Sequence, residues 1–206
     1  MTAMCDVAFL LLSFFILVAK YKPAETLNVT TPSSIDNGNV PEKDIVLVTM
    51  DKGGSVYFSV SDINVVEKKA IISAVNTAKG LNLTETEMKN FYSNPTAFIG
   101  VPFRYLKRLL DKSPDQLKNV KQEGIPCKDS TDNELIAWVG AAVNAFVGKT
   151  MHLMVKGDQA AKYPSFQGVI IAMKKNEQLK FQLITSPITA PAGSELEKSQ
   201  PAPLSH

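Results

Sequence analysis

The feature that most constrains this chain is an apolar run, Met1–Ala19, that contains a single charged residue, Asp6. A membrane-spanning helix needs about 20 mostly apolar residues, and the charge-free part after Asp6 is too short to supply them. The residues before Asp6 must therefore be included, which carries its carboxylate into the bilayer. An ionised Asp there costs at least about 2.5–3.5 kcal/mol, so such residues usually belong to an ion or proton path. The alternative is that Asp6 only caps a helix at the interface.

The flanks of the run bear on its orientation. Lys20 and Lys22 follow it and nothing basic precedes it, so the positive-inside rule alone would place the C-terminal side in the cytoplasm. The run also lacks the basic start and the small-x-small cleavage site of a signal peptide. We therefore interpret residues 1–20 as an uncleaved, single-pass helix in contact with membrane lipid.

The segment TAMCDVAFLLLSFF, Thr2–Phe15, resembles the transmembrane signature of the ExbD/TolR family, roughly T-P-M-V-D-V followed by a Leu/Phe-rich run. Two positions depart from that pattern, because Ala3 replaces the usual Pro and Cys5 replaces an aliphatic residue. Family members also begin with a short, often basic segment, so we expect the true start to lie upstream of Met1. The positions that match are Thr2, Met4, Asp6, Val7 and the apolar run after them.

The resemblance implies a function and a topology. It implies a proton-channel subunit of a TonB-type energiser in the bacterial inner membrane, with Asp6 as the carboxylate that carries the proton. It places the short N-terminus in the cytoplasm and the long C-terminal domain in the periplasm, opposite to the lysine signal. The implied partners are an ExbB-like channel subunit, a TonB-like protein and a second copy in a homodimer.

The position of Asp6 on a helix suggests one further candidate. Asp6, Phe9, Leu10 and Ser13 fall on one face, at i, i+3, i+4 and i+7. Ser13 is therefore either a polar neighbour on the proton path or a hydroxyl bonded to its own helix backbone. One helix with one carboxylate cannot enclose a water path, so a channel requires helices from a partner.

Composition excludes several other classes of function. The 206 residues carry a net charge of +2, which gives no electrostatic basis for binding nucleic acid. The two histidines, His152 and His206, form no metal cluster or Ser/His pair, and no P-loop or Rossmann fingerprint is present. We therefore predict no enzyme activity, no cofactor and no metal. Cys127 is either a small buried side chain or a thiol open to intermolecular pairing.

The rest of the chain divides into a linker, a domain and a tail. Residues 21–44 are rich in Pro, Thr, Ser and Asn without apolar periodicity, which predicts a flexible linker. Residues 45–186 form the predicted periplasmic domain. It opens with a hairpin, Ile45–Met50 and Ser55–Val60, joined by a Gly-containing turn. Residues 187–206 are rich in Pro, Ala and Ser and predict a disordered tail.

Helical patterns dominate the middle of the domain. One predicted helix opens near Ser61 or Asp62 and ends at Gly80, with Lys68 and Lys69 on a solvated face. Residues 80–127 resemble a helical insertion of the longer, Bacteroidetes-type ExbD proteins. Three helices are predicted there: one with a Thr84/Glu87 capping box, one over 104–112 with Tyr105, Leu106, Leu109 and Leu110 as its apolar stripe, and one over 114–121.

The last third predicts a regular α/β pattern. Thr131 and Glu134 match a second capping box before an apolar helix face, and Gly148 ends that helix. Strands at 150–156 and 179–185 flank a helix with Pro164 in its first turn, which predicts adjacent parallel strands. The expected fold is α+β: a single N-terminal transmembrane helix, a flexible linker and a small two-layer α/β periplasmic domain.

A different class of function fits much of this pattern. A membrane-tethered periplasmic binding module without a proton role would explain the linker and the domain, but not Asp6. A cell-wall anchor like the flagellar protein MotB also carries an Asp in its helix. No OmpA-like peptidoglycan-binding signature supports that third hypothesis.

Overall fold

The computed structural model describes residues 2–18, 33–34, 43–93, 98–112, 114–117, 120–129, 131–158, 161, 163–184 and 186–187. The predicted tail from residue 188 onward and most of the predicted linker lie outside these ranges. The helices are α1 Thr2–Val18, α2 Val65–Lys79, α3 Glu85–Tyr92, α4 Phe103–Leu110, α5 Pro114–Leu117, α6 Leu135–Ala145 and α7 Tyr163–Lys175. The strands are β1 Ser33–Ser34, β2 Ile45–Met50, β3 Val56–Val60, β4 Phe98–Ile99, β5 His152–Gly157, β6 Gln182–Ile184 and β7 Ser186–Pro187.

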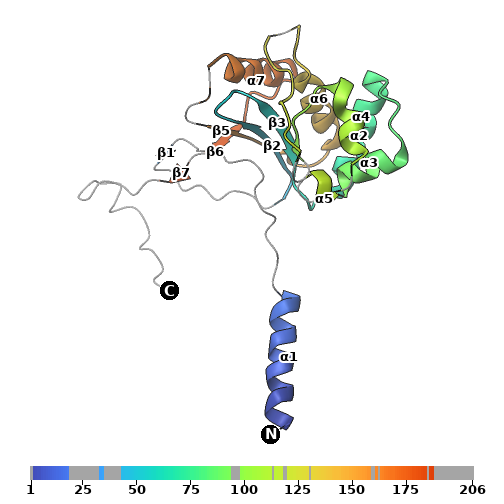
Figure 1. Cartoon of the computed structure of the whole chain (residues 1–206). Helices are drawn as coiled ribbons and strands as arrows, with labels where there is room; N and C mark the ends of the chain where they lie inside the picture. The colour runs from blue at the N-terminus through green and yellow to red at the C-terminus, as the bar shows by residue number, and fades with distance from the viewer. Residues whose placement is uncertain are drawn as a thin grey trace, which may run out of the picture.

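A mixed five-stranded sheet, in the order β4-β3-β2-β5-β6, organises the domain (Figure 1). The predicted hairpin is confirmed, since β2 and β3 pair antiparallel with Val48 opposite Phe58. Asp51 closes its turn, because its carboxylate accepts the amide of Ser55 and its carbonyl accepts that of Gly54. The predicted parallel pair, β5 with β6, is also confirmed, and β5 pairs parallel with β2 on its other side. The α+β class predicted from sequence is therefore correct.

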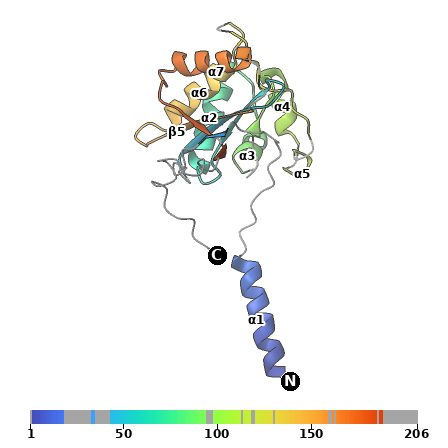
Figure 2. The same cartoon turned by 90° about the vertical axis from the view of Figure 1, so that its left-hand side faces the viewer.

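One hydrophobic core lies between the sheet and the helices. Alternate residues of β2, Val46 and Val48, are fully buried, as the two-residue period of a strand with one face on a core requires. Helices α7, α6 and α2 follow one another along the sheet (Figure 2), and each supplies buried apolar side chains. Those side chains are Ile71, Ile72 and Val75 from α2, Leu135, Trp138, Val139 and Ala142 from α6, and Val169, Ala172 and Met173 from α7.

The centre of the core is an aromatic cluster around Trp138, whose side chain is fully buried. Its ring lies 5.3 Å from Phe58 of β3, 5.9 Å from Phe91 of α3 and 5.7 Å from Phe103 of α4, measured between centroids. Because Phe91 and Phe103 belong to residues 80–127, that segment shares the core of the domain. It is also not purely helical, since the short strand β4 pairs with β3 at the edge of the sheet.

Several local predictions are confirmed and others are wrong. The Thr84 capping box forms, with Thr84 and Glu87 each accepting the other's backbone amide, and Gly80 ends α2 in the left-handed conformation. The start of α2 is three residues later than predicted, at Val65. Tyr105 is 43% exposed and so is not part of the buried stripe, and the guanidinium of Arg104 lies 4.7 Å from the centre of its ring.

The second predicted capping box is wrong. Glu134 occupies the cap position of α6, but no side-chain hydrogen bond caps that helix. The Glu134 carboxylate instead accepts the amide of Phe103, 2.6 Å away at the start of α4. Thr131 belongs to a separate turn, in which its amide and hydroxyl both donate to the carboxylate of Asp129. A long-range contact has therefore replaced the local one.

The predicted linker contains one short strand. Ser33 and Ser34 form β1, which pairs parallel with β7 at Ser186 and Pro187. Composition did not indicate a strand there, because backbone pairing over two residues requires no apolar pattern. Asp44, the last residue of the predicted linker, is hydrogen-bonded into the domain.

Candidate functional site

The two residues predicted to carry function both lie on α1. Asp6 is exposed, and no described residue bonds to its side chain. Ser13 lies seven positions later, which on a helix is the same face and about 10 Å along the axis, too far for a direct hydrogen bond. The Ser13 hydroxyl donates to the carbonyl of Phe9 at 2.6 Å. The structure thus shows the backbone bond that was one of the two interpretations of Ser13, and its place on a proton path stays a prediction.

The described side chains of α1, at positions 4 and 6–14, are almost all apolar and exposed. Met4 is 82% exposed and Phe9 67% exposed, and Val7, Leu10, Leu11, Leu12 and Phe14 are exposed as well. The helix has 17 residues, and in the described part of the chain no helix combines the length and apolarity needed to cross a membrane. Within the described ranges α1 therefore presents an uncovered apolar surface with a single carboxylate.

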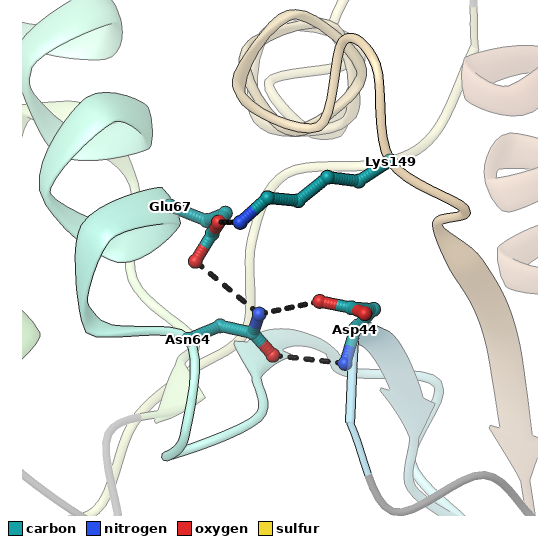
Figure 3. A network of polar contacts seen from close by, with 4 residues as sticks. All are labelled: Asp44, Asn64, Glu67 and Lys149. Atoms are coloured by element: carbon teal, nitrogen blue, oxygen red, sulfur yellow. Dashed lines mark hydrogen bonds and ion pairs between the residues drawn. The ribbon is translucent and has the colours of Figure 1, made fainter.

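A polar cluster that sequence analysis did not identify lies where the linker meets the domain. We call it the junction cluster, and it consists of Asp44, Asn64, Glu67 and Lys149 (Figure 3). The Asn64 amide group donates to the Asp44 carboxylate at 2.7 Å and to the Glu67 carboxylate at 3.2 Å. The Asn64 carbonyl oxygen accepts the backbone amide of Asp44 at 2.9 Å, and Lys149 forms an ion pair with Glu67.

Burial makes these contacts energetically significant. Asn64 is 5% exposed and Glu67 is 4% exposed, and a polar group removed from water is destabilising unless it is hydrogen-bonded. The hydrogen bond from Lys149 lowers the pKa of Glu67 below its ordinary value, against the opposing effect of burial. The same contact raises the pKa of Lys149. Both residues therefore remain charged across the physiological pH range.

A second buried charge lies next to this cluster on α2. Lys68 is only 1% exposed and forms an ion pair with Asp62 at 2.7 Å. The prediction that Lys68 lies on a solvated helix face is therefore wrong, although Lys69 is exposed. The partner is local, because Asp62 lies in the turn just before α2, six residues from Lys68, and its side chain stays 45% exposed.

The remaining candidate residues occupy structural positions. His152 begins β5, where its amide donates to the carbonyl of Asp44. Cys127 is buried, and burial raises its pKa to about 12, which leaves a protonated and unreactive thiol. Among the described residues, no group of three or more His, Cys, Asp or Glu side chains could hold a metal ion.

The junction cluster carried only weak signals in the sequence. Asn64 stands just before a helix, where Asn is a common cap, and Asp44 stands at the end of the linker. Lys149 and Glu67 are 82 residues apart, and neither lies in a recognisable motif. Only folding brings these residues together.

Comparison with known proteins identifies the family. The family described as "Biopolymer transport protein ExbD/TolR" matches residues 1–187, most of the 206-residue chain. Neither the curated proteins nor the solved structures gave a match. The matched region includes α1 with Asp6, the junction cluster and the whole described domain. The chain therefore belongs to the ExbD/TolR family of biopolymer transport proteins.

Proposed function

We propose that this protein is the proton-channel subunit of a TonB-type, ExbB–ExbD energy-transducing complex. Family membership gives the coarser role, energy transduction in biopolymer transport. The finer proposal adds that proton motive force across the bacterial inner membrane is coupled to transport at the outer membrane. In this proposal the chain is single-pass, with α1 in the membrane and the α+β domain in the periplasm.

The observation that carries this proposal is the isolated carboxylate on α1. Asp6 lies among exposed apolar side chains and occupies the Asp position of the family signature. In an apolar environment the neutral form of a carboxyl group is favoured, so proton uptake and release would change what Asp6 can contact. Charged Asp6 would face a polar group on surrounding helices, and neutral Asp6 could face an apolar wall.

The proposal requires partners, because α1 cannot enclose a proton path by itself. An ExbB-like subunit would supply the surrounding helices, and a second copy of this chain would complete a homodimer. The alternation at Asp6 would rotate α1 relative to the channel. The periplasmic domain would then pass that motion to a TonB-like protein.

The test replaces Asp6 by Asn in the full chain, expressed with its partners. Asn keeps the size of Asp but does not exchange a proton near neutral pH, and it is cheaper to bury in a bilayer. We expect loss of proton flux into vesicles and of uptake through a TonB-dependent transporter, with co-purification of the channel subunit unchanged. Asp6→Glu remains titratable and should retain partial activity. Normal uptake by the Asn variant would favour the alternative, a membrane-tethered periplasmic binding module without a proton role.

The proposed topology has its own test. A reporter that is active only in the periplasm, fused after Ser186, should give signal. A cytoplasmic reporter that works at the same position would contradict the proposed orientation and restore the one indicated by Lys20 and Lys22.

A further inference from the structure

The junction cluster fixes the chain where the linker becomes part of the fold. Asp44 precedes β2 directly and has a φ of 59°, a left-handed conformation that few residues other than Gly adopt. Two hydrogen bonds join it to Asn64, one through its amide and one through its carboxylate. A third joins its carbonyl to the amide of His152 at 2.8 Å. Together these three bonds fix the position and the backbone orientation of Asp44.

The Asn64 side chain bonds to Asp44 and does not cap its own helix, α2. It occupies the N-cap position of α2, yet its side chain makes no capping bond to that helix. An Asn at this position usually stabilises the helix by accepting an amide of the first turn. Here its carbonyl oxygen accepts the amide of Asp44 instead, and its amide group bridges Asp44 and Glu67. The local cap has been exchanged for a contact with the end of the linker.

The cluster also connects that point to two other parts of the domain. Glu67 lies in the first turn of α2, and its carboxylate pairs with Lys149 from the loop between α6 and β5. The bond from His152 adds the first residue of β5. Upstream of Asp44, the described chain makes only the two-residue pairing of β1 with β7. A displacement of Asp44 is therefore transmitted directly to α2 and to the α6–β5 loop.

We propose that the junction cluster is the coupling point through which movement of the anchor helix enters the domain. The two bonds between Asn64 and Asp44 pass tension in the linker to α2, and the pair of Glu67 with Lys149 passes it to the α6–β5 loop. This inference deepens the proposed function and rests on it. Because Glu67 and Lys149 stay charged, their ion pair is kept while protons pass through the channel. The junction cluster therefore stays intact throughout the transport cycle.

The experiment uses the full chain with its channel partner and compares two Asn variants of α2. Asn64→Ala removes the bonds to Asp44 and Glu67. Asn76→Ala is the matched control, because Asn76 lies at the other end of α2 and accepts the amide of Leu83 at 3.0 Å. Both variants lose side-chain hydrogen bonds on the same helix, but only the first affects the junction.

We expect Asn64→Ala to keep co-purification and proton flux while transporter uptake falls at least about tenfold. Asn76→Ala should keep both proton flux and uptake. Equal loss of uptake in the two variants, or normal uptake in Asn64→Ala, would overturn the coupling role. Asp6→Asn tests the proposed function separately, because it removes proton flux itself.

A second measurement covers the case in which Asn64→Ala is poorly folded. Lys149 is exposed over half of its side chain, so Lys149→Met removes the ion pair without opening a cavity in the core, and Lys149→Arg should preserve the ion pair. We expect uptake to fall several-fold in Lys149→Met and to recover in Lys149→Arg.

Amide hydrogen exchange in the full chain in micelles tests the connection without any transport assay. In Asn64→Ala, the amides of Asp44, of His152 and of Lys68, which donates to the backbone carbonyl of Asn64, should all exchange at least about tenfold faster. Faster exchange at Asp44 alone would show that loosening Asp44 does not affect α2 or β5, and would overturn the proposal.

Discussion

Helix α1 and the α+β domain differ in whether their apolar side chains are buried and whether their carboxylates have partners. In α1 the large apolar side chains from Met4 to Phe14 that the structure describes are exposed, with Phe9 at 67%, whereas in the domain Trp138 and Phe58 are fully buried. The carboxylate of Asp6 has no described partner, whereas that of Glu67 is buried and bonded to Asn64 and Lys149. The domain thus buries its aromatic core and pairs the buried charge of Glu67 within itself. The surface of α1 is one that other molecules must complete.

The largest expected difference between the two regions is the loss of stability on removing an aromatic ring from each. Trp138→Ala removes the ring that joins Phe58, Phe91 and Phe103, and should lower the free energy of unfolding by about 3–5 kcal/mol. Phe9→Ala removes a ring of similar kind from α1 and should leave the melting of the domain unchanged. Thermal unfolding of both variants provides the measurement. A shift of equal size for Phe9→Ala would mean that α1 packs against the domain.

The next effect concerns the buried charge of Glu67. Its pKa is lowered in the folded state by the bond from Lys149, relative to an ordinary value of 4.5. The resulting stabilisation is fully present above that value and is lost as the pH falls through the folded pKa. Glu67→Gln should therefore lower Tm by a few degrees at pH 7. The difference from the unchanged protein should disappear in strong acid, and a constant difference at every pH would exclude a charge effect.

A smaller effect separates two motifs that look alike in the sequence. Thr84→Ala removes a capping box in which Thr84 accepts the amide of Glu87 at 3.3 Å, and should cost about 1 kcal/mol. Thr131→Ala alters the other apparent capping box, which does not cap a helix in the structure, and should change stability by less than about 0.5 kcal/mol. Denaturant unfolding of the two variants measures both. An equal loss of stability in the two variants would contradict the finding that this second motif does not cap α6.

The smallest effect is expected at Ser13. Its hydroxyl proton is engaged by the carbonyl of Phe9, so Ser13→Ala should change proton flux by less than about twofold. Flux into vesicles, measured beside Asp6→Asn, provides the comparison. A loss approaching that of the Asp6 variant would place Ser13 on the proton path, the other role predicted from sequence.

The sequence by itself determined the features whose interactions are local. The turn between β2 and β3 is closed by Asp51 within four residues, and the Thr84 capping box spans three. The left-handed end of α2 requires only Gly80. Binary patterning also predicted the apolar face of α6, because helical periodicity does not depend on what the face packs against. The position of Asp6 in an apolar run was likewise visible directly.

Only the tertiary structure decided where the side chains with two possible partners bond. Glu134 is 31 residues from Phe103, and Lys149 is 82 residues from Glu67, so no local pattern can indicate either pair. The Asn64 side chain likewise bonds to Asp44, 20 residues earlier, and not to its own helix. In each case a long-range bond in a water-poor environment outcompetes a local or solvated one, since a buried polar group without a partner is strongly destabilising.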